Sequence, residues 1–173
     1  MDILTTIRDA DIGSSEPTPE KYEERKASRA VVFDREGKVA LLHSTVKHYH
    51  KLPGGGVEEN EDLETALRRE LLEEIGCAVE NIRELGSIEE YRNAVPLHQI
   101  SYCFTADLMG EKGLPHLEEG EIAEGFVTEW MDLDEAIKTM ENEADIDIYL
   151  AKFMQRRDVS FLKETEKRTL IIG

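Results

Sequence analysis

The sequence predicts one α/β domain in which helices cover a β-sheet, and three observations support this prediction. The chain has 173 residues and is 40% hydrophobic, which is enough for one domain with a substantial core. Residues 98–108 alternate between apolar and polar side chains, as expected of a half-buried strand. Segments typical of strands and of helices follow one another in mixed order, which indicates a layered α/β or α+β architecture.

The predicted strands begin with a hairpin. "RAVVF" (29–33) and "KVALLH" (38–43) flank "DREG", whose Asp34 and Gly37 suit the ends of a tight turn. "GFVTEW" (125–130) is a further strand, and "TTIRDADI" (5–12) a weaker, peripheral one. We therefore divide the chain into an N-terminal extension, residues 1–26, and a single domain, residues 27–173, which includes the C-terminal helices.

Three helices are predicted from capping residues and periodicity. The first begins after Asp62, a good N-cap, and ends at Gly76, a good C′ residue. The second follows Asp132 and the third follows Asp145. Their apolar faces have helical spacing: Leu133, Ala136, Ile137 and Met140 in the second, and Ile146, Leu150, Phe153 and Met154 in the third.

The charge balance limits the partners. Lys and Arg total 21 against 38 Asp and Glu, so the formal net charge is −17. Such a surface repels phosphate backbones and anionic membranes, and we expect neither long nucleic acid nor membrane as a partner. The cysteines, Cys77 and Cys103, are too few for a disulfide framework and are expected to be free thiols. The start, "MDILTTIRDADIG", lacks the basic and apolar regions of a signal peptide, and we expect a cytoplasmic protein.

The first helix carries an unusual group of carboxylates. Glu70, Glu73 and Glu74 lie in its last turns, where the helix dipole disfavours negative charge. Crowded carboxylates repel one another, which raises their pKa values unless a cation holds them ionised. Mg²⁺ prefers such hard oxygen ligands and keeps waters in place for substrate phosphates. The alternative is an acidic face that is merely solvated, as in many charge runs.

Eight residues fix the family resemblance: Gly55, Glu61, Arg69, Glu70, Leu71, Glu73, Glu74 and Gly76. In their spacing, Gly-x5-Glu-x7-Arg-Glu-aliphatic-x-Glu-Glu-x-Gly, they resemble the signature of the Nudix hydrolases. The sequence departs from the family at Cys77, where a bulky aliphatic residue is usual, and at Asn60, where many members have Gly. The resemblance implies an α/β/α sandwich with a mixed β-sheet over roughly residues 27–156.

The resemblance also implies a reaction: a divalent metal and water hydrolyse a pyrophosphate bond in a small nucleotide or nucleoside diphosphate derivative. Glu70, Glu73 and Glu74 would bind Mg²⁺ or Mn²⁺, and Glu73 and Glu74 would also be catalytic. Arg69 would hold the carboxylates in place, and Gly55 would shape the loop at the substrate. Glu58 and Glu61 are candidate outer ligands. On this interpretation metal cations, rather than Lys and Arg, match the charge of the substrate.

The resemblance leaves two places for the general base: a glutamate of the signature, or one on a loop remote in sequence. The segment "HLEEGEIAEGFVTEW" offers Glu118, Glu119, Glu121 and Glu124 between strands, where such a loop would lie. We choose Glu121, because Ile122 and Phe126 could anchor the loop around it. A solvated acidic loop without a function is the alternative.

Other site residues and functions stay open. Tyr49 or His50 is expected to edge a base-binding pocket, whereas His48 and His50 as a metal pair lack a third ligand. The alternative functions are hydrolysis of oxidised nucleoside triphosphates and non-catalytic nucleotide sensing. The sequence leaves open whether the protein forms a homodimer. It also leaves open whether residues 1–26 would mediate such a dimer.

Overall fold

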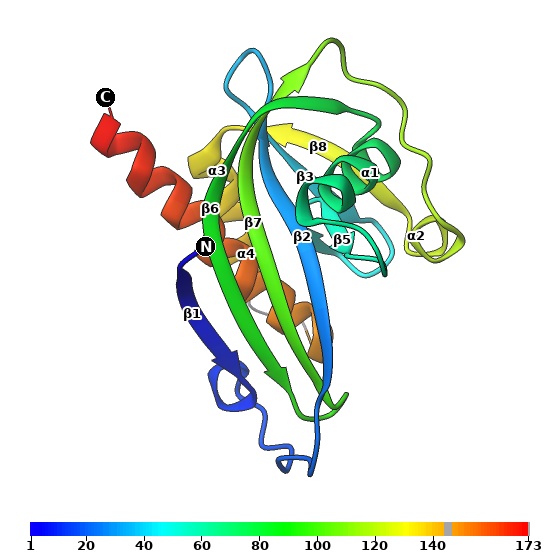
Figure 1. Cartoon of the computed structure of the whole chain (residues 1–173), viewed down its shortest axis with the longest axis vertical. Helices are drawn as coiled ribbons and strands as arrows, with labels where there is room; N and C mark the ends of the chain where they lie inside the picture. The colour runs from blue at the N-terminus through cyan, green and yellow to red at the C-terminus, as the bar shows by residue number, and fades with distance from the viewer. Residues whose placement is uncertain (144–146, 173) are drawn as a thin grey trace.

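The computed structural model describes residues 1–143 and 147–172. Within these residues eight strands form one sheet, covered by four α-helices (Figure 1). The strands are β1 (Ile3–Arg8), β2 (Glu23–Phe33), β3 (Val39–Ser44), β4 (Tyr49–Lys51), β5 (Gly54–Gly56), β6 (Ala78–Arg92), β7 (Leu97–Met109) and β8 (Phe126–Met131). The helices are α1 (Leu63–Ile75), α2 (Glu119–Ala123), α3 (Leu133–Glu141) and α4 (Tyr149–Ile172), with a 3₁₀ turn η1 (Asp9–Ile12) after β1.

The sheet is mixed. Its strand order is β1-β6-β7-β2-β3-β4, with β5 paired to β2 and β8 paired to β3. The pairs β1–β6 and β2–β7 are parallel and the others antiparallel. Strand β3 pairs with β2 only at Phe33–Val39, after which β5 takes its place beside β2 at residues 27–29. The sheet therefore splits between β2 and β3, and the candidate site lies beside this split.

Each face of the sheet has its own hydrophobic core. Leu67, Leu71 and Ile75 of α1 pack on one face, against residues such as Val32 and Phe104. Residues of α3 and α4, including Met140, Phe153 and Phe161, pack with Leu41 and Ile88 on the other face. Figure 1 shows α1 on one side of the strongly curved sheet and α4 crossing behind it. The predicted α/β/α sandwich is confirmed.

Local signals placed the first helix and the hairpin correctly. The Asp62 carboxylate accepts a hydrogen bond from the Thr65 N–H at 2.7 Å and caps α1. Gly76 ends the helix with φ 64°, a left-handed conformation that glycine adopts readily. In the hairpin, the Gly37 N–H donates to the Asp34 carbonyl at 3.0 Å, so β2 and β3 are joined by the expected turn.

The C-terminal helix differs from its prediction. Asp145 and Ile146 lie outside the described residues, and α4 begins at Tyr149. Leu150 is 38% exposed, so it does not belong to the buried face that it was expected to share with Phe153. The helix also continues past Arg157 to Ile172 and buries Phe161 and Leu162 in the second core. Among the described residues, no helix is both long and apolar enough to cross a membrane.

Strand β7 was expected to be buried on one face only, and this was wrong. Gln99, Ser101 and Cys103 lie on its second face and are also buried. The reason is that α4 covers this face with polar groups as well as apolar ones. The Gln99 side-chain amide donates to the buried Glu90 carboxylate at 2.9 Å, so polar residues are satisfied there without water.

The N-terminal residues extend the sheet. β1 lies at its edge and pairs in parallel with β6 (Figure 1). β2 begins at Glu23, upstream of the strand predicted from "RAVVF", and pairs with β7 along its whole length. The charged residues of this upstream half concealed the strand from sequence reasoning. Both cysteines are buried free thiols, as predicted.

Candidate active site

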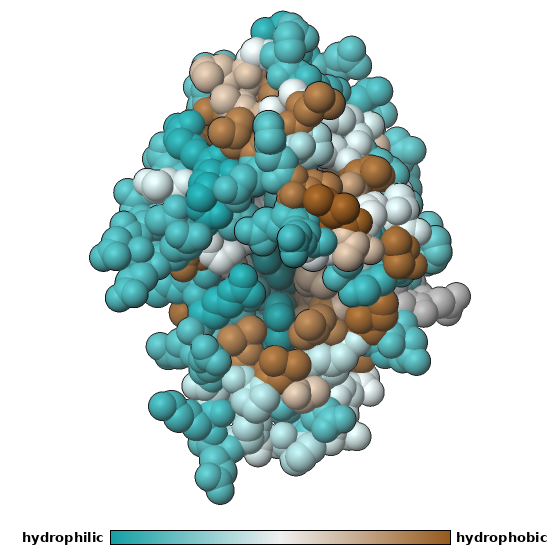
Figure 2. Space-filling model, turned by 90° about the vertical axis from the view of Figure 1, so that its right-hand side faces the viewer, coloured by the Kyte–Doolittle hydropathy of each residue, from teal (hydrophilic) through white to brown (hydrophobic). Residues whose placement is uncertain are grey.

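A cavity of about 310 Å³ opens between the C-terminal half of α1, strand β5 and the first turns of α4. It is lined by Arg25, Arg29, Lys51, Gly54, Gly55, Gly56, Glu70, Glu73, Glu74, Arg92, Gln99, Glu118, Glu121, Leu150, Met154 and Arg157. Figure 2 shows a hydrophilic hollow near the centre of the face that carries α1 and α2, with hydrophobic residues around it. All three predicted metal ligands reach this cavity.

Glu74 is the most buried carboxylate of the site. It is 2% exposed, and burial, the main cause, raises its pKa to about 7. The Lys51 ammonium lies 2.8 Å from Glu74 Oε1 and lowers the pKa, whereas a hydrogen bond with Glu121 raises it. The Gly54 N–H donates to Glu74 Oε2. Raised pKa values were predicted from crowding at the helix end, but the dominant cause is burial.

Gly55 is required because Glu70 lies against its backbone. A Cβ atom added at Gly55 would lie 2.5 Å from the Glu70 carboxylate, closer than Cβ atoms approach other groups, so the carboxylate would have to shift. Burial raises the pKa of Glu70, and the neighbouring Arg69 guanidinium opposes this. The glycine of the signature thus makes room for a carboxylate at the cavity wall.

Arg69 connects the carboxylates to the loop before the helix. Its guanidinium lies 2.9 Å from Glu70 Oε1 and 3.1 Å from Glu73 Oε2, and it also donates to the Gly56 carbonyl at 3.1 Å. Glu61 accepts two hydrogen bonds from Arg69, at 2.9 and 3.0 Å. Arg69 is placed to hold Glu70 and Glu73, as the resemblance implied. Glu58 and Glu61 do not line the cavity, and Glu61 is the anchor of Arg69.

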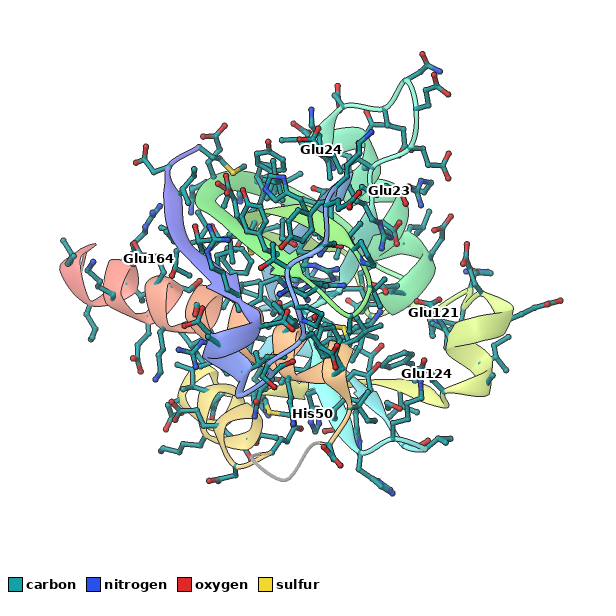
Figure 3. All side chains as sticks on the ribbon, turned by 90° about the horizontal axis from the view of Figure 1, so that it is seen from below. Glu23, Glu24, His50, Glu121, Glu124 and Glu164 are labelled. Atoms are coloured by element: carbon teal, nitrogen blue, oxygen red, sulfur yellow. The ribbon has the colours of Figure 1, made fainter. Side chains whose placement is uncertain are left out.

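Glu121, from the short helix α2, also reaches the cavity, although it is remote from α1 in sequence. Its Oε1 lies 3.8 Å from Lys51 Nζ. Ile122 was expected to anchor this segment but is 64% exposed. Instead Glu124 provides an anchor by accepting hydrogen bonds from Tyr49 at 2.8 Å and Lys47 at 2.6 Å. Figure 3 labels Glu121 and Glu124 on this segment.

Part of the cavity wall is basic, which sequence reasoning missed. Arg25, Arg29, Arg92 and Arg157 line it together with Lys51. The expectation that metal cations rather than Lys and Arg match the substrate charge did not take these residues into account. These residues come from β2, β4, β6 and α4, and no local motif connects them. Only the strand spacing of Arg25 and Arg29, upstream of the apolar run in β2, could have indicated that both point the same way.

The basic wall is held by a buried polar network. Arg157, fully buried, donates to both oxygens of Asp158, at 2.6 and 2.9 Å, and lies 3.5 Å from Glu90. Arg29 donates to the Gly54 carbonyl at 2.7 Å, and burial lowers its pKa to about 10. Within the described residues, the Nε atoms of Arg29 and Arg92 are buried without a hydrogen-bond partner. Both side chains line the cavity and retain donor capacity.

Tyr49 and His50 do not line this cavity. Tyr49 packs in the core beside Phe126, and its hydroxyl donates to Glu124. His50 points to the opposite face of the sheet and contacts Glu143 and Glu129. Both residues therefore lie outside this cavity, and Lys51, the next residue of β4, reaches it instead.

The donor set suits a hard divalent cation. Three carboxylates from one helix share a cavity wall, and a glycine leaves space for one of them. Carboxylate oxygens are the protein ligands that Mg²⁺ and Mn²⁺ prefer. Glu70, Glu73 and Glu74 are thus the residues that could hold such an ion.

Comparison with known proteins agrees with this geometry. A family model described as "NUDIX domain" matches residues 23–153. The RNA pyrophosphohydrolase of Bartonella henselae is 33% identical over 135 residues, which cover 64% of this chain and 77% of that protein. Its counterpart from Caulobacter vibrioides strain NA1000 is 35% identical over 122 residues, covering 61% and 70%.

Two solved structures share the fold. A NUDIX hydrolase from Nitrosomonas europaea has a TM-score of 0.63 and 17% identity, covering 84% of this chain and 90% of that one. The MutT NUDIX hydrolase from Burkholderia pseudomallei has a TM-score of 0.54 and 24% identity, covering 65% and 85%. The family match spans most of the chain, and the signature residues meet in one cavity. The chain therefore belongs to the NUDIX family and is a pyrophosphohydrolase, as its sequence predicted.

Proposed function

We propose that this enzyme hydrolyses the pyrophosphate bond of a small nucleotide or nucleoside diphosphate derivative, with Mg²⁺ or Mn²⁺ held by Glu70, Glu73 and Glu74. The observation that carries the proposal is that the three α1 glutamates and a group of basic side chains line the same cavity of about 310 Å³. A volume near the lower end of small-molecule sites suits a diphosphate and part of its substituents. When bound, the metal would neutralise the diphosphate and lower the pKa of the attacking water.

The basic wall would bind the phosphate oxygens. Arg25 is exposed at the rim, and its guanidinium lies against Gly56, where an added Cβ would be 2.9 Å from Nη2. Arg92 has a buried Nε without a partner among the described residues. Guanidinium groups bind phosphate through paired, charge-assisted hydrogen bonds. The substrate's negative charge would thus be shared between the arginines and the metal site.

Glu121 is the proposed proton acceptor. It reaches the same cavity as the metal carboxylates, but α2 carries it, so it can contact water without being one of the three α1 ligands. We expect Glu121→Gln to lower kcat by roughly 10² to 10⁴ while the affinity for Mg²⁺ holds. Glu119→Gln, an exposed neighbour that does not line the cavity, is the matched control. If Glu121→Gln keeps the wild-type kcat, Glu121 is not the proton acceptor, and Glu118 or one of the α1 glutamates would take that role.

A substrate panel tests the proposal. The enzyme would be incubated with one nucleotide at a time in the presence of Mg²⁺ or Mn²⁺, and the released phosphate and pyrophosphate would be measured. The panel would contain nucleotide sugars, ADP-ribose, dinucleotides, and ordinary and oxidised nucleoside triphosphates. We expect at least one small nucleotide to be cleaved, with no turnover in EDTA. If the protein binds a nucleotide but cleaves none of them with either metal, the result would support the sensing alternative and overturn the proposal.

RNA is a second candidate substrate, because the curated relatives are named RNA pyrophosphohydrolases. The net charge of −17 opposes contact with a long phosphate backbone, but the basic wall could hold the 5′ end alone. Comparing kcat/KM for a 5′-triphosphorylated RNA oligomer with kcat/KM for a free nucleoside triphosphate distinguishes RNA from a small nucleotide as the substrate. We expect the small nucleotide to be preferred, and a clear preference for RNA would replace the first candidate.

A further inference from the structure

A cluster of two histidines and two glutamates lies on the face of the sheet opposite Lys51. His43 of β3 and His50 of β4 are directly paired across the strands, and Glu129 of β8 stands beside them. One ligand atom from each of these three side chains lies within 4.8 Å of the other two. None of these three residues lines the cavity, and Figure 3 shows His50 away from Glu121.

The contacts of the cluster converge on Glu129. Its Oε1 lies 2.8 Å from His43 Nδ1, and its Oε2 lies 3.2 Å from His50 Nε2. The two imidazole rings are stacked, with centroids 4.3 Å apart and planes inclined by 12°. His50 is 7% exposed, whereas the side chain of His43 is 25% exposed and has room to turn. Because the rings are stacked, binding one ion would require the more exposed His43 ring to rotate out of the stack and aim a ring nitrogen at the ion beside His50.

Glu143 adds an outer contact. Its carboxylate binds the second ring nitrogen of His50, Nδ1, and its Oε2 accepts the His50 backbone N–H at 3.2 Å. Histidines that bind a metal commonly donate their other ring N–H to a carboxylate, which fixes the tautomer and ring orientation. Glu129 is thus the candidate third ligand that the sequence did not reveal beside His50, with Glu143 behind the ring. His48 is exposed and is not part of the cluster.

We propose that His43, His50 and Glu129 form a second metal site, with Glu143 as its outer carboxylate, for a borderline-soft cation such as Zn²⁺. Two imidazoles and one carboxylate are ligands that Zn²⁺ takes in proteins, with a fourth position open to water. The α1 site offers carboxylates only, which suits Mg²⁺ or Mn²⁺. The ligands come from three adjacent strands, so the ion would cross-link β4, β3 and β8 at the position where β4 also delivers Lys51 to the cavity.

Cobalt spectroscopy tests the site without using enzyme activity. Co²⁺ would be titrated into metal-stripped protein in excess Mg²⁺, which occupies carboxylate sites, and visible absorption and Zn²⁺ displacement would be followed. We expect one Co²⁺ per chain with the absorption of a four-coordinate N/O site, displaced by one Zn²⁺. The absence of such a band in the wild-type protein would overturn the proposal.

Variants assign the band to its residues. His43→Gln and Glu129→Gln should abolish it, and Glu143→Gln should weaken Zn²⁺ affinity by about 10- to 100-fold. His48→Asn removes a neighbouring exposed histidine at a left-handed position that Asn tolerates, and should leave the band unchanged. Glu74→Gln should also leave it unchanged. Loss of the band in Glu74→Gln, or its survival in His43→Gln, would contradict the assignment.

Discussion

Lys51 Nζ lies 2.8 Å from Glu74 Oε1, and this ion pair joins strand β4 to the end of α1 inside the cavity. The same ammonium lies 4.6 Å from the centroid of the Phe126 ring. Lys51 therefore supplies positive charge to the most buried carboxylate of the candidate metal site. A bound metal ion and Lys51 would both favour the ionised form of Glu74.

Replacing Lys51 should change how activity depends on pH. Lys51→Met removes the cation that lowers the pKa of Glu74, so this pKa should rise further above about 7. The acid limb of kcat/KM, measured at subsaturating Mg²⁺, should move to higher pH by on the order of one unit. Lys47→Met, which removes a lysine paired with Glu124, is the control. An unchanged acid limb in Lys51→Met would show that Glu74 does not govern it.

The stability of the metal-free protein should fall as pH rises from 4.5 to 7. The pKa of Glu74 is raised from 4.5 to about 7, so the native state binds a proton that the unfolded state has released. The free energy of unfolding should therefore decrease across this window by on the order of 3 kcal/mol. Chemical denaturation in EDTA at several pH values would measure it.

Two comparisons distinguish the contribution of Glu74 to this pH dependence from that of the general charge repulsion in an acidic protein. Glu74→Gln should lose most of this pH dependence, because Gln does not titrate. Saturating Mg²⁺ should also reduce it, since the metal favours the ionised carboxylate. Equal slopes in wild type and Glu74→Gln would assign the pH dependence to other groups.

Gly55→Ala should disturb the site while sparing the fold. Its new methyl group would meet the Glu70 carboxylate at 2.5 Å, so the carboxylate must move. A displacement of this kind should lower kcat/KM by about 10²-fold. Gly120→Ala is the control, because an added Cβ there meets nothing within 4 Å. Equal kcat/KM values for the two variants would show that the position of Glu70 is not critical.

Arg157 should be important for stability. Arg157→Met leaves Asp158 buried without its cation and leaves Glu90 with Arg92 alone, which should cost about 3 to 5 kcal/mol. Arg156→Met changes the exposed neighbouring arginine and should stay within about 0.5 kcal/mol of wild type. Urea denaturation measures both. Similar unfolding free energies for the two variants would contradict the role of the buried network.

Local and periodic signals predicted those parts of the molecule that depend on neighbouring residues. Asp62 and Gly76 bound α1 because capping is a local interaction, and the fixed spacing of the signature placed Glu70, Glu73 and Glu74 at one wall. The basic wall could not be predicted in this way, because Arg92 and Arg157 meet only after the sheet and α4 have packed.

The errors on β7 and α4 have a related cause. Gln99 and Ser101 are polar, and pattern analysis assigns polar positions to solvent. Here a buried network with Glu90 satisfies them. Leu150 and Ile122 are apolar but exposed, one at the cavity and one on α2. In each case a tertiary contact, or its absence, decided burial.

On the proposed function, the carboxylates of α1 carry metal-dependent pyrophosphate hydrolysis. The direct measurement is the turnover of a cleaved nucleotide with Mg²⁺ by wild type, Glu73→Gln, Glu74→Gln and the control Glu64→Gln, an exposed residue of the same helix paired with Arg68. Gln is as good a helix former as Glu, so the fold should be kept. We predict that both site variants lose several orders of magnitude in turnover, with poor rescue by added metal, while Glu64→Gln matches wild type. Full turnover in both Glu73→Gln and Glu74→Gln would contradict the claim.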